Sequence, residues 1–322
     1  MNLKDKKLLY ELDINSREKE TELARKVGTS KQVINYNIKR LFNEGIIKKF
    51  QTVLNLDDLG INIYANVYFK LIGATKQKET EIINFLIKSD SVGYIASIGG
   101  RFDLSIVLVA KNLQEFENKL DKIVTSYPEL RDYEISLRTF GVKFHKKYLV
   151  SKDQVKSKEI LVKPTKIPKI DKIDIGILKI LSQNSRISIV EISDKLKIPF
   201  STVRVRIKSL EQKGIIAGYS ILFDLSKIGF VNYKLFIKSK DKSDKTYKRM
   251  LSFVKENKNI IWFFKTIGEH DFELRIEVEN QEKYQEIIKE LRSEFSAEIE
   301  EIETVLIFNE LKEDYSVVLE NM

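Results

Sequence analysis

The sequence contains no cysteine and only two histidines, His145 and His270. The absence of cysteine excludes disulfides, thiolate nucleophiles and cysteine-ligated zinc or iron–sulfur sites. Two histidines are too few for most metal sites and leave little histidine acid–base chemistry. We therefore predict a protein that is not an enzyme and has no catalytic residues, no metal and no cofactor.

Long apolar runs are also missing. No window reaches the roughly 18 uninterrupted apolar residues of a membrane span, and the start of the chain lacks the apolar core of a secretory signal. These absences predict a cytoplasmic protein without a membrane partner. The 322 residues are 43% hydrophobic, which is enough for several buried cores.

Positive charge is in excess, but it is concentrated in three blocks. The net charge of +9 includes +5 in residues 1–50, +4 in 170–219 and +7 in 143–169, so the remainder of the chain is acidic at −7. A basic footprint for nucleic acid should be local. The distribution therefore favours contact with nucleic acid at these blocks rather than over the whole chain.

An internal repeat organises the chain. At an offset of 169 residues, positions 5–64 match 174–233 at 17 of 60 places, so the two halves are homologous. Later, "GRFD" at 100–103 corresponds to "GEHD" at 268–271, with one residue slipped in a loop. The lysine-rich stretch between the copies is predicted to be a linker. If its centre is flexible it spans about 25 Å, so the halves either reposition or pack as partners.

Each copy begins with a pattern typical of three short helices. Three successive runs have apolar residues at helical spacing, and the same pattern returns in copy two. The runs are Leu8, Leu9 and Leu12, then Leu23, Ala24 and Val27, then Ile34, Ile38 and Leu41. Gly45 and Gly214 follow the third helices at the usual C-terminal cap position, and each is followed by an extended segment.

The rest of each copy alternates strand and helix in the order β-α-β-β-α-β, with helices near 77–88, 112–126, 243–257 and 281–295. This order predicts a four-stranded antiparallel sheet with both helices on one face and an uncovered apolar face that a partner must cover. We predict an α+β protein of two repeats, each a three-helix winged helix-turn-helix followed by a ferredoxin-like βαββαβ sensing domain. The predicted domains are helix-turn-helix domains at 1–55 and 170–224, ferredoxin-like effector and dimerisation domains at 56–145 and 225–315, and the linker at 146–169.

The second and third helices of each copy have a mechanism for binding double-stranded DNA. A short helix held across a tight turn can place its exposed side chains in the major groove, where Gln and Asn read adenine, Arg reads guanine, and Ser, Thr and Lys hold phosphate. The residues predicted to face DNA are Ser30, Lys31, Gln32, Asn35, Tyr36 and Lys39 in copy one, and Ser201, Thr202, Arg204, Arg206 and Lys208 in copy two, where Pro199, Phe200 and Val205 share the same face. The alternative is an ordinary three-helix packing unit with a solvated polar face.

Copy two resembles the Lrp/AsnC, or feast-famine, regulators. The resemblance is carried by Arg186-Ile187-Ser188, by "STVRVRI" from 201 and by "KGIIAGY" from 213, and it extends over nearly all of both halves outside the linker. Copy one departs from the pattern at "SREKETEL", where the Ile-Ser after Arg17 is missing. The resemblance implies transcriptional regulation and a sensing domain that dimerises through its sheet.

The resemblance also implies a small effector, often an amino acid, near a Gly-x-x-Asp turn. Gly100 and Asp103, and Gly268 and Asp271, fit this pattern. A carboxylate at such a turn can hold an α-amino group, but Gly and Asp are also ordinary turn residues. The effector assignment and the turn assignment therefore both stay open.

Three further features have ordinary explanations. Trp262, Phe263 and Phe264 fit a buried strand better than an effector site. The acidic run 298–303 is predicted to be a solvated strand face. The linker lysines either contact phosphate or keep a tether soluble, and we favour the tether.

Two alternatives to a regulator remain. Fused pairs of similar domains also occur in the siroheme decarboxylases, which would be expected to place histidines in a pocket, whereas copy one offers no pocket histidine. The other alternative is a sensor or scaffold whose helix-turn-helix has decayed. We predict instead a fused pseudo-dimer that pairs its two sensing domains, forms homo-oligomers and presents two unlike recognition helices to an asymmetric DNA site.

Overall fold

We describe the protein from a computed structural model of residues 1–151, 160–162 and 170–322, without the side chains of 160–162. Most of the predicted linker at 146–169, including the majority of its lysines, lies outside the described residues. Within these ranges, no helix is both long enough and apolar enough to span a membrane.

The described residues form two compact units, and each unit contains part of both copies. The helical unit comprises Met1–Leu59 and Lys143–Phe230, and the barrel unit comprises Gly60–Val142 and Val231–Met322. Both helix-turn-helix domains therefore belong to one unit and both ferredoxin-like domains to the other. The sequence predicted that the two sensing domains pair, but it did not predict that the two helix-turn-helix domains join in one unit.

The helical unit confirms the predicted three helices and following strand in each copy. Leu9, Leu23 and Ile34, one apolar residue from each predicted helix, are fully buried. Asn2 and Ser30 accept hydrogen bonds from backbone N–H groups at the starts of their helices, as N-cap residues do. The elements are α1 (Leu3–Ile14), α2 (Glu20–Val27), α3 (Lys31–Asn43) and β1 (Ile47–Leu54) in copy one, and β6 (Ile160–Val162), α6 (Lys172–Gln183), α7 (Ile189–Leu196), α8 (Phe200–Gln212) and β7 (Ile216–Phe223) from copy two and the segment before it.

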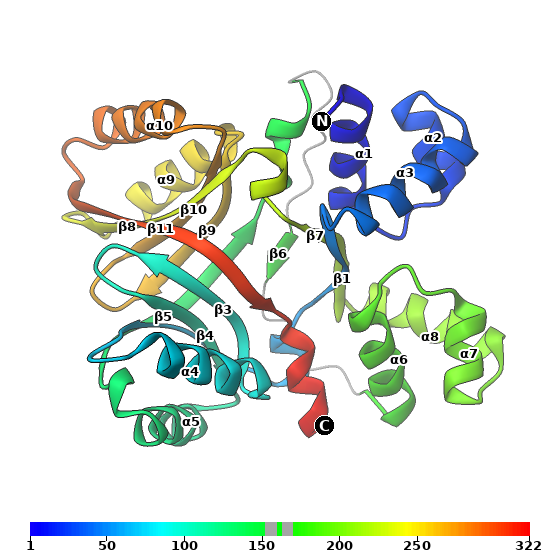
Figure 1. Cartoon of the computed structure of the whole chain (residues 1–322), viewed down its shortest axis with the longest axis horizontal. Helices are drawn as coiled ribbons and strands as arrows, with labels where there is room; N and C mark the ends of the chain where they lie inside the picture. The colour runs from blue at the N-terminus through cyan, green and yellow to red at the C-terminus, as the bar shows by residue number, and fades with distance from the viewer. Residues whose placement is uncertain (152–159, 163–169) are drawn as a thin grey trace. The chain divides into compact units, whose positions relative to one another are not determined.

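The two copies are joined within the helical unit. Strand β1 pairs antiparallel with β7, with three helices of each copy beside this ribbon (Figure 1). Arg17 donates to the carbonyls of Ser185 and, at 3.0 Å, Ile187, and Arg186 donates in return to the carbonyl of Ser16 at 2.5 Å. Each bond from a charged donor stabilises by roughly 1.5–3 kcal/mol. Arg17 and Arg186 thus hold the copies together, and the copies pack as partners in this unit.

The start of the predicted linker is part of the helical unit. Lys147–Leu149 form a 3₁₀ turn, η3, in which Tyr148 and Leu149 are buried. The Tyr148 ring stacks on Phe230 with centroids 4.3 Å apart. The prediction of a tether beginning at residue 146 is therefore wrong for these residues, because their aromatic and aliphatic side chains find apolar partners.

The barrel unit confirms the predicted β-α-β-β-α-β order in both copies. Its elements are β2 (Ile63–Lys70), α4 (Lys76–Lys88), β3 (Val92–Gly99), β4 (Leu104–Ala110), α5 (Leu113–Ser126) and β5 (Asp132–Lys143) in copy one, and β8 (Val231–Ser239), α9 (Asp244–Glu256), β9 (Ile260–Ile267), β10 (Phe272–Val278), α10 (Gln281–Glu294) and β11 (Ile299–Glu313) in copy two.

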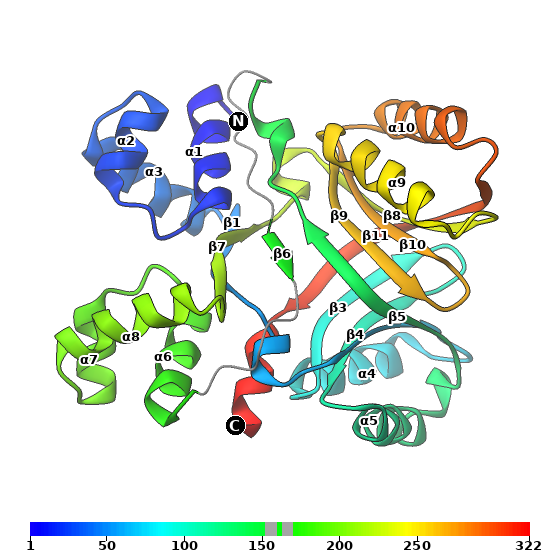
Figure 2. The ribbon, with the colours of Figure 1, turned by 180° about the vertical axis from the view of Figure 1, so that it is seen from behind.

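The two four-stranded sheets join edge to edge into a closed barrel. Their strands follow the order β2-β4-β3-β11-β8-β10-β9-β5, and β5 pairs again with β2. Strand β3 of copy one pairs antiparallel with β11 of copy two. Helices α4 and α5 lie outside one half of the barrel, and α9 and α10 lie outside the other half (Figure 2). Closure removes the exposed strand edges that an open sheet leaves.

Successive residues of each strand point in turn toward the outer helices and toward the barrel interior. Val67 and Phe69 of β2 belong to the apolar core under the helices. Asn66 and Tyr68 face inward, because Tyr68 packs edge-on against Phe236 of the other copy at 4.9 Å. The sheet face that was predicted to be apolar and to need a partner lines the barrel interior, where the other copy covers it. One part of the interior is apolar, but the Asn66 amide donates at 2.6 Å to Glu273, a buried carboxylate.

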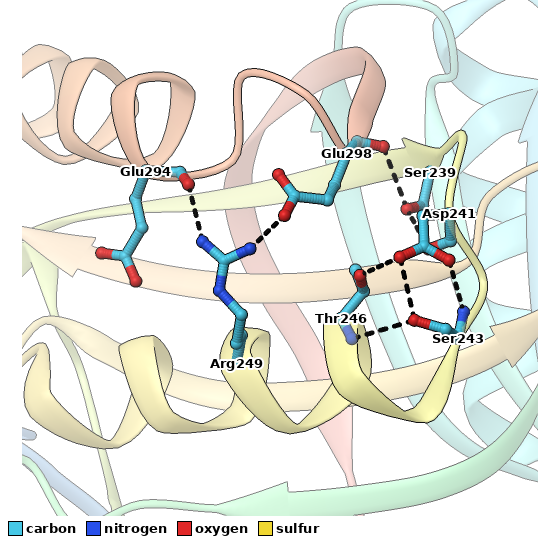
Figure 3. Close-up of polar contacts among 7 residues, drawn as sticks. All are labelled: Ser239, Asp241, Ser243, Thr246, Arg249, Glu294 and Glu298. Carbon is cyan, nitrogen blue, oxygen red and sulfur yellow. Dashed lines mark hydrogen bonds and ion pairs between the residues drawn. The ribbon is translucent and has the colours of Figure 1, made fainter.

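A polar cluster fixes α9 to the loop before β11 (Figure 3). The Asp241 carboxylate accepts from the hydroxyls of Ser243 at 2.8 Å and Thr246 at 2.5 Å, and Ser243 caps the helix. One turn further along, Arg249 binds the carboxylate of Glu298. Glu298 belongs to the acidic run that was predicted to be solvated, so its residues include ion-pair partners as well as exposed side chains.

Candidate nucleic-acid interface

Helix α3 presents a polar face to solvent. Ile34, Ile38 and Leu41 are buried against the rest of the domain, as their spacing predicted. The predicted DNA-facing residues of this helix, Lys31, Gln32, Asn35, Tyr36 and Lys39, are all exposed, and Ser30 is exposed at its N-cap. Its side chain already accepts from the backbone N–H of Val33 at 3.3 Å, so Ser30 has a capping role without DNA.

Helix α8 places Ser201, Arg204 and Lys208 on its exposed face, while Thr202 is half-buried. Phe200 and Val205 are 51% and 66% exposed, and in copy one Tyr36 is 66% exposed at the position equivalent to Val205. Exposed apolar groups on such a helix suit contact with the thymine methyl group. Arg204 is equivalent to Asn35 of copy one. The exposed faces of α3 and α8 therefore carry different polar groups at the same helix position.

Arg206 has an internal partner that the sequence interpretation missed. Its guanidinium lies 2.9 Å from the Asp171 carboxylate and 3.3 Å from that of Asp174, which together form the N-terminal cap of α6. In copy one, Arg40 contacts Asp5, the counterpart of Asp174, at 2.7 Å. The aspartates align in the repeat, but the arginines do not, because Arg206 aligns with Asn37 and Arg40 with Ser209. Arg206 therefore has a role in anchoring its helix, and Arg204 is the exposed arginine.

The turn before each recognition helix differs between the copies. Gly28 has φ of 76° at the end of α2, and Lys197 has φ of 53° at the end of α7. This left-handed conformation is easy for glycine and strained for a residue with a Cβ atom. Copy two thus builds the same turn at a conformational cost.

The Gly-x-x-Asp turns lie in the barrel unit, and their aspartates bind the main chain. Asp103 accepts from the backbone N–H of Leu71 at 2.8 Å, and Asp271 accepts from that of Ser239 at 2.9 Å. Asp271 also lies 2.8 Å from the Lys242 ammonium. These bonds give both carboxylates a role in shaping the ends of β2 and β8, as the turn assignment requires.

Close packing explains the glycine in the second turn. A Cβ atom on Gly268 would lie 2.7 Å from the carbonyl oxygen of Ile135, which is backbone and cannot move aside cheaply. At Gly100 the nearest atoms would be 3.4 Å away, which is looser, but its φ of 129° still favours glycine.

The two turns are connected by a row of four rings in contact across the barrel. Phe102 packs on Tyr68 at 5.5 Å, Tyr68 on Phe236 at 4.9 Å, and Phe236 on His270 at 5.0 Å. Phe102 and His270 occupy the same place in "GRFD" and "GEHD". The contact explains how the turns of the two copies come together, which the strand pattern alone did not predict.

Carboxylates surround His270. Its Nδ1 lies 3.4 Å from Glu134 and its Nε2 3.7 Å from Glu303. Burial disfavours the charged ring, but the hydrogen bond with Glu134 and the nearby Glu269 and Glu303 raise the pKa of His270 above its usual value. Arg101, which contacts all three carboxylates, lowers the pKa of Glu269 to about 2.

Known protein families match both parts of the chain. The winged helix-turn-helix DNA-binding family model matches twice, at residues 1–48 and 170–217, and the Lrp/AsnC ligand-binding domain model matches residues 235–317. These matches coincide with the helical unit and the second ferredoxin-like domain, so the chain combines winged-helix DNA-binding domains with a ligand-binding domain. The chain belongs to the Lrp/AsnC family, in a tandem form.

Curated relatives agree with this assignment. The chain is 30% identical over 123 residues to the DNA-binding transcriptional activator DecR of Escherichia coli, covering 38% of this chain and 81% of DecR. It is 32% identical over 119 residues to the HTH-type transcriptional regulator FL11 of Pyrococcus furiosus, covering 37% of this chain and 77% of FL11.

A solved structure matches the whole duplicated architecture. The siroheme decarboxylase NirDL superposes with a TM-score of 0.64 over 99% of this chain and 98% of its own, at 14% identity. At this identity the likeness concerns the fold: two winged-helix domains and two ferredoxin-like domains in one chain.

Proposed function

We propose that this protein is a transcriptional regulator of the Lrp/AsnC type that binds an asymmetric DNA site with two unlike recognition helices. The observation that carries the proposal is that α3 and α8 belong to one compact unit, joined by the β1–β7 ribbon, and expose different side chains at equivalent positions. Two-fold symmetric proteins read palindromes because the same helix is used twice. Here the two helices differ.

Each helix has its own base preference in this proposal. Gln32 and Asn35 suit bidentate contact with adenine, and Arg204 suits guanine. Lys39 and Lys208 occupy equivalent exposed positions and contact phosphates, which position the protein without reading sequence.

Selection of binding sites from a random DNA library tests the proposal. We expect two half-sites of different sequence, separated by about one helical turn or a multiple of it. A strictly palindromic consensus bound by a single chain would contradict it. If the protein retains no DNA even at low salt, the regulator assignment is wrong, because binding through phosphates strengthens as the salt concentration falls.

Substitutions assign the half-sites. Asn35→Ala should relax base preference in one half and Arg204→Ala in the other, by roughly ten- to a hundredfold each, since a bidentate contact gives about 1–3 kcal/mol of discrimination. Lys39→Ala and Lys208→Ala are the controls, which should weaken all sequences alike and lower the salt slope by about one. Arg206→Ala is the matched arginine control and should lower stability while leaving base preference unchanged.

We further propose that the ligand-binding domains modulate DNA binding through a small molecule, with a coupling free energy of about 1–3 kcal/mol. The family supports a ligand-binding role, and site selection with and without amino acids present measures the coupling. Chains are also proposed to associate into homo-oligomers, which sedimentation velocity would detect. The decarboxylase alternative rests on fold alone, and a purified protein with a porphyrin absorbance band would revive it.

A further inference from the structure

Two apolar side chains on α8 are exposed and belong to no core. Phe200 and Val205 are 51% and 66% exposed, whereas Val203, Ile207 and Leu210 form the buried face of this helix. A single exposed apolar residue is ordinary, but two of them share the helix face that was predicted to meet DNA. Their exposure therefore favours an apolar contact with whatever surface this face meets.

Both side chains lie next to Arg204 on the helix surface. Phe200 precedes Arg204 by four residues, so the two are neighbours on one face of the helix. Val205 is the next residue in the sequence, about 100° further round the helix. Lys208 follows Arg204 by four residues and is exposed on the same face. The guanidinium of Arg204 is therefore flanked by apolar groups and lies one turn from a cation suited to phosphate.

The side chain of Arg204 is available to a partner. It makes no ion pair or side-chain hydrogen bond with any residue in the described ranges. Arg206, two residues further on, is instead held by Asp171 and Asp174 at the cap of α6. The donors of Arg204 thus remain for a ligand, as recognition of a base requires.

Copy one shows that the fold does not require apolar groups at these two positions. The equivalents of Phe200 and Val205 are Lys31 and Tyr36, which are both exposed and both carry a polar atom. The two copies have the same helices and the same buried positions. The apolar pair of copy two is therefore explained by what α8 contacts and not by how the domain packs.

The edges of base pairs in the major groove provide a matching surface. Guanine presents two acceptors, N7 and O6, to an arginine fork, and thymine presents a methyl group that apolar side chains contact. Adjacent base pairs are about 3.4 Å apart, so an arginine and its neighbouring side chains can reach two pairs at once. Cytosine presents an amino donor and lacks the methyl group.

We propose that α8 recognises a guanine together with the methyl group of a thymine in the adjacent base pair. Arg204 contacts the guanine, and Val205 and Phe200 contact the methyl group. The inference rests on the DNA binding proposed above and adds a pyrimidine methyl group as a determinant of one half-site. A 5-methylcytosine at the position of that thymine presents the same methyl group, so this half-site also responds to cytosine methylation.

Binding of the full chain to modified DNA tests the inference. The probe is the selected duplex with each thymine replaced in turn by uracil, which pairs identically but lacks the methyl group. One replacement, beside the guanine whose preference Arg204→Ala relaxes, should weaken binding about fourfold, as burial of one methyl group implies. At the same position, 5-methylcytosine should bind about fourfold more tightly than cytosine.

Variants assign the effect to α8. In Val205→Ala the uracil replacement should have almost no effect, because the methyl group has lost its contact, and Phe200→Ala should reduce the effect as well. Val190→Ala is the matched control. This valine is 57% exposed on α7, outside the recognition helix, so the fourfold effect of uracil should remain.

The inference and the proposed function fail in different ways. If the wild-type chain retains no DNA, both are wrong. If it selects a defined site but uracil and 5-methylcytosine leave its affinity unchanged, or if the guanine has no neighbouring thymine, DNA recognition stands and the inference is wrong. A uracil effect that persists in both Val205→Ala and Phe200→Ala would also overturn it. If a variant does not fold, the wild-type chain with the modified duplexes decides.

Discussion

At the scale of single residues, Asp13 shows how a buried charge can be satisfied. Its carboxylate accepts from the Ser220 hydroxyl at 2.9 Å and the Lys146 backbone N–H at 3.0 Å, and it lies 3.2 Å from the ring of His145. Burial disfavours its charge, but the hydrogen bond from His145 and the positive charge of Lys143 hold the pKa of Asp13 well below its usual range. Copy two has Ser182 at this position, so the repeat gave no sign of the role.

Asp13→Ala should lower the free energy of unfolding by about 3–5 kcal/mol at pH 7, because removing one partner of a buried charged network leaves the others unsatisfied. Because the folded pKa lies below the unfolded one, this stabilisation is present above about pH 4 and is lost as pH falls further. Urea unfolding across pH measures both effects. Equal acid sensitivity in the variant and the wild type would contradict the assignment.

His270 predicts a pH dependence of opposite sign. Its folded pKa is raised, so its stabilisation is complete below the unfolded value near 6.5 and is lost as pH rises through the folded pKa. His270→Gln should flatten this decline between pH 6 and 8, and proton NMR of the ring would give the pKa directly. The charged groups around this ring are Glu134, Glu269, Glu303 and Arg101. A ring pKa below 6.5 would count against it.

At the scale of elements, the helices and strands follow from local patterns, but their partners do not. Helical spacing placed Ile34 and Ile38 inside, and both are buried. Alternation along a strand tells which residues share a face, whereas the pairing of β3 with β11 depends on the closed order of both sheets. For the same reason the sequence did not predict that Arg206 binds the cap of α6 or that Asn66 binds Glu273 across the barrel.

Lys197→Gly should stabilise the helical unit by about 0.5–1 kcal/mol, since glycine removes the strain of a left-handed residue while adding freedom to the unfolded chain. Thermal and urea unfolding would detect this change. The matched substitution Gly28→Lys should destabilise by a similar amount. A destabilised Lys197→Gly variant would show that the lysine side chain makes a contact worth more than the strain.

At the scale of the whole molecule, sequence order and spatial grouping differ. The repeat predicted two similar halves, and each half does contain the predicted domains, but the compact units group like with like across the halves. The chain therefore passes between units, and each unit depends on both copies. The uncovered apolar face of each predicted sheet indicated that the two sensing domains pair. The joining of the two helix-turn-helix domains was not predicted, because it arises from contacts between distant residues such as Arg17 and Ser185.

A cut between the copies should therefore leave them associated. We expect a chain cleaved at a protease site introduced within residues 152–159 to elute as one species in size-exclusion chromatography and to separate only in denaturant. The β1–β7 ribbon and the closed barrel both hold the fragments together. Elution as two separate halves under native conditions would contradict the shared units.

The covalent joining of α3 and α8 in one chain changes how the protein can evolve. In a homodimer every substitution appears twice, so a new base preference must suit both half-sites at once, and a new charge near the symmetry axis meets its own copy. If this chain reads an asymmetric site as proposed, a substitution at Asn35 or Arg204 alters one half-site and leaves the other intact. Glutamate at 273 could likewise arise opposite Asn66 without a second glutamate facing it, because the equivalent residue in copy one is Ser105.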